Sequence, residues 1–166
     1  MLNEVIGLKE RNSLYTVERE AVRAIIMRNN KILMIASSME DYKLPGGGVE
    51  QGENHEAAVT REVEEETGFT VTYVKDYLGK IVERRLDLYK KDQVFEMTSH
   101  YYICEIDEKQ GALRLDEYEK DLNFHPVWLQ ISDAIKTNEK LLSERKDKDS
   151  GWLYRELFVL KEISKL

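Results

Sequence analysis

The sequence is poor in cysteine and proline and contains no long apolar run. Its 166 residues include one cysteine and two prolines. The single Cys104 excludes an internal disulfide, and the apolar residues before it predict a buried small side chain rather than a reactive thiol. No stretch approaches the roughly 18 apolar residues of a membrane helix, and the first residues lack the basic start and apolar core of a signal peptide. We therefore expect a soluble, cytoplasmic protein.

Positive charge is also scarce. The chain has 25 Lys and Arg residues against 32 Asp and Glu residues, a formal net charge of −7. A surface that grips long nucleic acid needs basic patches, so this balance disfavours such a partner. The length suits a single domain over residues 1–166, large enough to bury most of its apolar surface without disulfides.

Acidic residues are concentrated in one short segment. Arg61 is followed by four glutamates within five residues: Glu62, Glu64, Glu65 and Glu66. In a helix Glu62, Glu65 and Glu66 would share one face, while Glu64 would point away. The repulsion between these carboxylates does not stabilise a fold. A hard divalent cation bound by the carboxylate oxygens would remove this repulsion. The segment is therefore either a metal site or a solvated acidic helix face, which is the commoner fate of charge runs.

The flanking residues predict a loop followed by a helix. Asn54 is suited to the N-cap and Gly68 to the position just after the helix, which predicts a helix from about Asn54 to Thr67. Its apolar stripe is narrow, so one side can pack while the other carries acid. Glycines before the helix free the backbone for a tight loop: Gly46, Gly47, Gly48 and Gly52.

The stretch from Gly47 to Phe69 resembles the signature of the Nudix hydrolases. That signature has Gly, five free positions, Glu, seven free positions, Arg-Glu, an aliphatic residue, a free position, Glu-Glu, a free position, Gly and an apolar residue. Every fixed place is filled: Gly47, Glu53, Arg61, Glu62, Val63, Glu65, Glu66, Gly68 and Phe69. The signature spans 23 of the 166 residues, so it specifies the catalytic element and hardly constrains the substrate.

The resemblance implies roles for the charged residues of the signature. The three glutamates of one helix face would bind divalent metal, and Glu62 would also assist the water nucleophile. Arg61 would orient a catalytic glutamate, either Glu53 or Glu62; its alternative is a simple i, i+4 ion pair with Glu65. Glu53 would be catalytic, although the helix dipole alone favours a carboxylate at this junction.

Two further metal ligands are suggested by relatives of this kind. Some use a backbone oxygen in the glycine loop, which here would be the carbonyl of Gly46. Others add an acidic residue from a later loop, for which Glu119 is the candidate and Glu117 the alternative. Either glutamate could equally be an ordinary surface residue.

The implied activity is hydrolysis of a pyrophosphate bond in a nucleoside diphosphate linked to another moiety, with Mg²⁺ or Mn²⁺ as cofactor. The substrate would be a small nucleotide, such as a nucleoside triphosphate or an ADP-ribose-like molecule. Since chain and substrate are both anionic, bound metal ions would be needed to invert the local charge. The alternative is a catalytically silent nucleotide-binding sensor, which the complete set of glutamates disfavours. A homodimer is compatible with the sequence.

The remaining candidates have ordinary structural interpretations. The three histidines lack metal-ligand spacing and are predicted to be structural or surface groups: His55, His100 and His125. Three aromatic residues could stack a nucleobase, but such residues are more often part of a core: Tyr42, Trp128 and Trp152.

The rest of the chain predicts an α+β fold. Glu18–Met27 and Lys31–Ala36 should form a hairpin at Asn29-Asn30, and residues up to Thr16 either start with a short strand or stay mobile. Further strands are expected at Phe69–Leu88, with a bend at Gly79, at Val94–Ile106 before a loop at Asp107–Gly111, and at Pro126–Leu129. Two helices should follow, at 132–144 with Ser132 as cap and at 150–163 after a charged 145–149 link. The resemblance implies the α/β/α sandwich of the Nudix fold, with a mixed sheet between helices and the signature loop-helix-loop at one edge.

Overall fold

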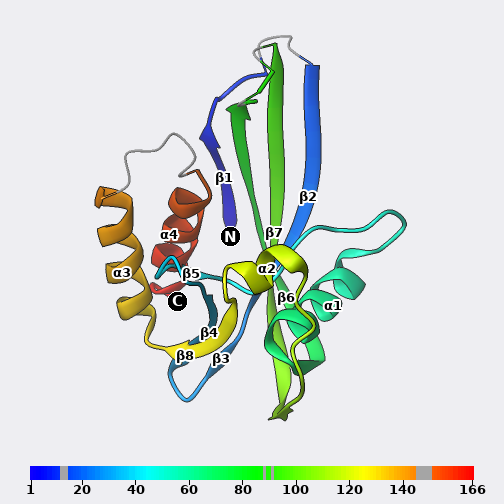
Figure 1. The fold of residues 1–166 in the computed structure, drawn as a ribbon, viewed down its shortest axis with the longest axis vertical. Helices are drawn as coiled ribbons and strands as arrows, with labels where there is room; N and C mark the ends of the chain where they lie inside the picture. Colours follow the sequence, from blue (N-terminus) through cyan, green and yellow to red (C-terminus); the bar gives the residue numbers. More distant parts are fainter. Residues whose placement is uncertain (12–14, 88, 91, 145–150) are drawn as a thin grey trace.

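Two four-stranded sheets form the framework of the computed structural model (Figure 1), which describes residues 1–11, 15–87, 89–90, 92–144 and 151–166. The first sheet has the order β1-β6-β7-β2. It is mixed, because β6 and β7 are antiparallel while β1 pairs with β6 and β2 pairs with β7 in parallel. Its strands are β1 (Leu2–Gly7), β2 (Tyr15–Ile25), β6 (Phe69–Leu86) and β7 (Gln93–Gln110).

The second sheet is antiparallel and is built on β4. Its strands are β3 (Met27–Arg28), β4 (Lys31–Ala36), β5 (Tyr42–Lys43) and β8 (His125–Leu129). The predicted hairpin is confirmed, since Asn29 and Asn30 turn the chain between β3 and β4 with φ of 49° and 61°. Because β3 begins two residues after β2 ends, this segment connects the two sheets.

Helices lie on both sides of the first sheet (Figure 1). On one side α1 contacts β2, β6 and β8, and on the other α4 contacts β1 and β6 and also packs on α3. Across the described ranges of the chain, the helices are α1 (His55–Thr67), α2 (Glu117–Asp121), α3 (Ile131–Glu144) and α4 (Gly151–Ile163). The expected α+β fold with helices around mixed strands is therefore confirmed.

Each side of the sheet has its own core. One core joins β1, β6 and β7 to the last two helices through residues such as Ile81, Tyr101 and Leu160. The other contains Val59 and Val63 of α1 packed with strand residues, among them Cys104. Cys104 is buried, which confirms the predicted packing role, and burial raises the pKa of its thiol to about 12.

The predicted break in the strand at Asp107–Gly111 is wrong. β7 continues to Gln110, where it is still paired with Phe69. Register shifts along β6 change its alignment with β7 at several points, and the two long strands stay paired. One shift lies between Tyr77 and Gly79, as predicted; Gly79 has φ of 122°, and an added Cβ would lie 1.9 Å from the Leu2 carbonyl oxygen.

Smaller differences concern the ends of elements. The strand expected to reach residue 88 ends at Leu86, and α3 begins at Ile131 rather than after Ser132. The predicted 145–149 link and the start of the last helix at 150 lie outside the described residues. Within the described residues, no helix combines the length and apolar character needed to span a bilayer.

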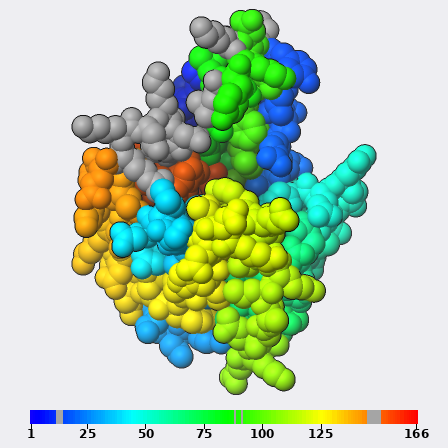
Figure 2. Space-filling model, in the orientation of Figure 1, coloured from blue at the N-terminus to red at the C-terminus, as the bar shows by residue number. Residues whose placement is uncertain are grey.

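The short α2 was not predicted, although its capping box is visible in the sequence. Asp116 accepts from the backbone N–H of Glu119, and the Glu119 carboxylate accepts from that of Asp116, at 2.8 and 2.9 Å. The segment from β7 to β8, drawn in yellow-green and yellow, crosses the visible face between α1 and α3 (Figure 2). This crossing brings Glu119 towards the glycine loop.

Candidate active site

The signature helix α1 is bounded as the sequence predicts. The Asn54 side chain accepts from the Ala57 backbone N–H at 2.8 Å, which satisfies one free donor of the first turn. Gly68 adopts the left-handed conformation with φ of 73°, and its N–H donates to the Glu64 carbonyl at 3.0 Å. The glutamates therefore project from a helix that is fixed at both ends.

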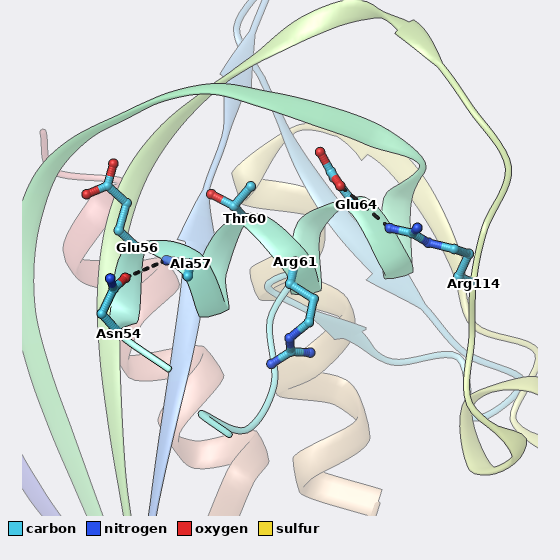
Figure 3. A pocket seen from close by; sticks show the side chains of 7 residues that line it. All are labelled: Asn54, Glu56, Ala57, Thr60, Arg61, Glu64 and Arg114. Carbon is cyan, nitrogen blue, oxygen red and sulfur yellow. Dashed lines mark hydrogen bonds and ion pairs between the residues drawn. The ribbon is translucent and has the colours of Figure 1, made fainter. Parts of the chain in front are cut away.

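The acidic residues of α1 divide between two faces. Glu62 and Glu66 are only 8% and 5% exposed, while Glu65 is half-buried. Glu64 points elsewhere and forms an ion pair with Arg114 at 3.5 Å (Figure 3). The outer face belongs to an open pocket with the following lining: Asn54, Glu56, Ala57, Thr60, Arg61, Glu64 and Arg114.

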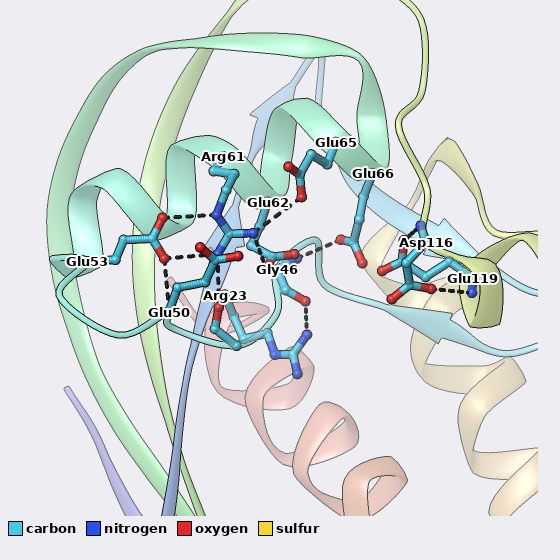
Figure 4. Close-up of polar contacts among 11 residues, drawn as sticks. Arg23, Gly46, Glu50, Glu53, Arg61, Glu62, Glu65, Glu66, Asp116 and Glu119 are labelled. Carbon is cyan, nitrogen blue, oxygen red and sulfur yellow. Dashed lines mark hydrogen bonds and ion pairs between the residues drawn. The ribbon is translucent and has the colours of Figure 1, made fainter.

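Arg61 does more than form an i, i+4 pair. Its Nε and Nη2 donate to the two oxygens of Glu53, both at 2.9 Å, in a bidentate contact. Its Nη1 donates to Glu62 at 2.8 Å and to Glu65 at 3.2 Å (Figure 4). The hydrogen bonds from Arg61 lower the pKa of Glu53. One guanidinium thus orients three carboxylates of the signature.

The glycine loop lies directly against the buried carboxylates. The Gly46 N–H donates to Glu66 Oε2 at 2.7 Å, and its carbonyl accepts from the Arg23 guanidinium (Figure 4). A Cβ on Gly46 would lie 2.1 Å from the Val22 carbonyl oxygen, and one on Gly47 would lie 2.5 Å from Glu62 Oε2. Glycine at position 46 therefore lets the loop lie against the backbone of β2, and glycine at position 47 leaves room for the Glu62 carboxylate.

Burial disfavours the charged state of the inner carboxylates. It raises the pKa of Glu66 to about 8, against a hydrogen bond from Gly46 and the charge of Arg23. Burial also raises the pKa of Glu62 and of Glu119, and the Glu119 charge contributes to the shift of Glu66. Buried anions with too little compensating positive charge are suited to receive a cation.

The predicted metal ligands are all oxygen donors. Carboxylates and a carbonyl match the preference of Mg²⁺ and Mn²⁺, and the set comprises Glu62, Glu65, Glu66, the Gly46 carbonyl and Glu119. In the described part of the chain, no three of these carboxylates lie within 4.8 Å of one another. Mg²⁺ keeps several waters and needs only one or two direct carboxylates, so the residues present fit such an ion.

A pocket opens beside this group. Gly46, Glu66 and Glu119 form part of its lining, whereas Glu117 does not line it. Five basic residues share the lining: Arg19, Arg23, Lys43, Arg85 and Arg155. Four aromatic residues complete it: Phe95, Tyr118, Phe124 and Trp152. Sequence reasoning missed most of these, because they come from seven different elements or loops and follow no common spacing.

The three candidate stacking residues have different fates. Trp152 lines the pocket, where Lys43 Nζ lies 4.5 Å from its ring centroid. Trp128 packs edge-on against Phe69 near the α1 core, and Tyr42 packs against the other core. Only the first of the three is thus available to a ligand of this pocket.

The histidines are arranged differently from the expectation. His125 is exposed and contacts the Asn123 carbonyl through Nδ1 at 2.8 Å, as a surface group. His55 and His100 are 45 residues apart in sequence, but their ring centroids are 4.2 Å apart, with Glu20 beside them. Their lack of metal-ligand spacing in the sequence therefore concealed a real grouping.

Comparisons with known proteins identify the family and the fold. The family description "NUDIX domain" matches residues 17–150. An ADP-ribose pyrophosphatase of Methanocaldococcus jannaschii is 47% identical over 70 residues, which are 40% of this chain and 41% of that protein. The human diphosphoinositol polyphosphate phosphohydrolase NUDT4B is 28% identical over 113 residues, covering 66% of this chain and 55% of that protein. The chain thus spans less than two thirds of the length of either relative.

Solved structures show the same fold. A MutT NUDIX hydrolase from Burkholderia pseudomallei superposes with a TM-score of 0.53 at 22% identity, covering 70% of this chain and 85% of that one. At this identity the likeness concerns the fold alone.

Proposed function

The chain belongs to the Nudix family, and from this premise we propose that it hydrolyses the pyrophosphate bond of a nucleoside diphosphate linked to another moiety. One observation carries the proposal. Glu66, Gly46 and Glu119 line the same pocket as five basic residues and Trp152. A substrate held there would have its phosphates among cations and beside the oxygen ligands, and its base within reach of an aromatic ring.

The charged residues of the signature would divide the work. A divalent ion, Mg²⁺ or Mn²⁺, held by the oxygen donors of Glu62, Glu65, Glu66, Gly46 and Glu119, would polarise phosphoryl oxygens and make water a better nucleophile. Glu62 has a raised pKa and is held by Arg61 at 2.8 Å, as suits a group that accepts a proton from water. Glu53 stays ionised and fixes Arg61 from the other side.

Within this class we favour an ADP-ribose-like substrate or another nucleotide. The M. jannaschii relative is named for ADP-ribose, and the pocket combines aromatic rings with cations. The human relative is named for diphosphoinositol polyphosphates, which carry no aromatic base and many more phosphates. The five basic residues of the pocket make that class the second candidate.

A silent nucleotide-binding sensor is the alternative outside catalysis. The intact Arg61 network and the complete glutamate set disfavour it, since a sensor has no need to orient these carboxylates. We further propose action in the cytoplasm, because the single cysteine suits a reducing compartment.

A substrate panel tests the proposal. Purified protein with Mg²⁺ is incubated with ADP-ribose, nucleotide sugars, nucleoside triphosphates, dinucleoside polyphosphates and a diphosphoinositol polyphosphate, and products are followed by chromatography and ³¹P NMR. We expect release of a nucleoside monophosphate from at least one nucleotide. Cleavage of the inositol compound alone would favour the second candidate, and binding without turnover would favour the sensor. Light scattering on the same sample determines whether the active unit is a monomer or a homodimer.

A further inference from the structure

Two histidines and a glutamate from three elements meet outside the fixed positions of the signature. Glu20 lies on β2, His55 opens α1, and His100 lies on β7, whose neighbouring strand is β2 (Figure 1). One ligand atom from each residue falls within 4.8 Å of the other two. Among the residues that the structure describes, no other trio of His, Cys, Asp or Glu side chains is gathered so closely.

The distances in this trio are long for hydrogen bonds. Glu20 Oε1 lies 3.3 Å from His100 Nε2, and Glu20 Oε2 lies 3.8 Å from His55 Nε2. An N–H···O hydrogen bond is usually about 2.9 Å long. Two ligands that bind one tetrahedral Zn²⁺ at about 2.05 Å are separated by roughly 3.3 Å. The Glu20–His100 contact is therefore a long hydrogen bond whose length also matches the separation of two ligands on one ion.

Tyrosine hydroxyls occupy the opposite nitrogen of each ring. Tyr102 Oη lies 2.9 Å from His55 Nδ1, and Tyr77 Oη lies 3.1 Å from His100 Nδ1. The two tyrosine rings pack together with centroids 5.1 Å apart. A metal-binding histidine is normally held in this way, with its second nitrogen engaged by an outer partner. Both Nε2 atoms are thereby directed towards Glu20.

The trio is buried on the His100 side and open on the Glu20 side. The His100 side chain is 12% exposed, while that of Glu20 is 57% exposed, so an ion can enter from the Glu20 side. Burial, followed by the charge of the nearby His55, lowers the pKa of His100.

We propose that Glu20, His55 and His100 form a second metal site, which takes Zn²⁺ or a similar transition-metal ion. Two imidazole nitrogens and one carboxylate suit such ions, whereas Mg²⁺ prefers oxygen ligands. Three protein ligands leave a fourth position for water. An ion at this site would tie the first turn of α1 to β2 and β7, next to the loop that carries Glu53.

The first test uses the intact, untagged protein in saturating Mg²⁺, which occupies the carboxylate centre. Zn²⁺ is titrated by calorimetry, and the imidazole ¹⁵N signals are followed by NMR. We expect one equivalent of Zn²⁺ to bind and to shift the His55 and His100 signals while leaving those of His125 unchanged. No zinc binding, or shifts at His125 alone, would overturn the proposal.

Matched variants complete the test. His100→Ala and Glu20→Gln each remove a direct ligand and should weaken Zn²⁺ binding at least ~100-fold. Tyr102→Phe removes only the hydroxyl that contacts His55 and should weaken Zn²⁺ binding about tenfold. His125→Ala and Glu66→Gln should bind Zn²⁺ like the unchanged protein. Loss of binding in Glu66→Gln, or equal affinity in Glu20→Gln, would place the ion elsewhere. Circular dichroism of each variant confirms its fold, and the exposed Glu20 keeps the test valid if His100→Ala unfolds.

Discussion

The backbone N–H of Gly46 donates to Oε2 of Glu66 at 2.7 Å, across the junction between the glycine loop and the signature helix. Glu66 is otherwise buried, and burial raises its pKa to about 8. The N–H of Gly46 therefore positions the Glu66 carboxylate beside the Gly46 carbonyl, which is itself a proposed metal ligand. This relationship links the loop, the helix and the proposed metal ion.

Metal removal should abolish turnover. We expect hydrolysis of the best substrate to stop in excess EDTA and to return when Mg²⁺ is added beyond the chelator, because the inner carboxylates supply only oxygen ligands. Product formation is measured by chromatography. Full turnover in excess EDTA would contradict the metal-dependent mechanism.

Glu66→Gln should separate stability from catalysis. Burial raises the pKa of Glu66 in the folded protein to about 8, above its ordinary value of 4.5. Between pH 4.5 and pH 8 the folded state therefore binds a proton at Glu66 that the unfolded state has lost. Stability of the unchanged protein in metal-free buffer should therefore fall as pH rises from 4.5 to 8, and the variant should lose this slope.

The measurement is the thermal midpoint in EDTA at pH 5 and pH 8.5. The thermal midpoint of the variant should be higher than that of the wild-type protein at pH 8.5 and closer to it at pH 5. The turnover of the variant in Mg²⁺ should drop by orders of magnitude. Glu108→Gln, an exposed change of the same charge, should do neither. A Glu66→Gln protein that melts earlier at pH 8.5 would show a structural role instead.

Glu62 and Glu66 should act as a unit. They stand at i and i+4 on one buried face, so both can serve the same ion or ion pair. Glu62→Gln and Glu66→Gln should each remove most of kcat, and the double variant should be little slower than the worse single one. If the two losses multiply, the carboxylates act independently.

Arg61→Lys should lower kcat although charge is kept. Lysine cannot reproduce the bidentate contact with Glu53 while also reaching Glu62 and Glu65. We expect a loss of about tenfold or more in kcat, with little change in KM. Arg114→Lys, at the exposed pair with Glu64, is the control and should keep full activity. Equal rates for both variants would show that the network is dispensable.

Trp152→Leu should weaken substrate binding. Stacking of a base on an aromatic ring contributes about 1–3 kcal/mol, so KM for a nucleotide should rise at least fivefold while kcat changes less. Tyr154→Leu, two residues further on the same helix but outside the pocket lining, should leave KM unchanged. An unchanged KM in Trp152→Leu would remove this residue from base recognition.

Much of the catalytic element was predictable because its interactions are local. Asn54 and Gly68 bound a helix through contacts within a few residues, and the spacing of Glu62 and Glu66 determines their common face. The hairpin at Asn29-Asn30 was predictable for the same reason. The extension of β7 to Gln110 was not, because it depends on register shifts in a partner strand.

The sequence by itself determined the family signature, the helix that presents it and the oxygen character of the proposed metal ligands, since neighbours in the chain make these features. Tertiary structure alone decided that Glu119 rather than Glu117 reaches the pocket, and that Lys43, Arg85 and Trp152 surround it. It also decided that Glu20, His55 and His100 meet. Such side chains are brought together by sheet pairing and helix packing, and no spacing along the chain records which distant residues will become neighbours.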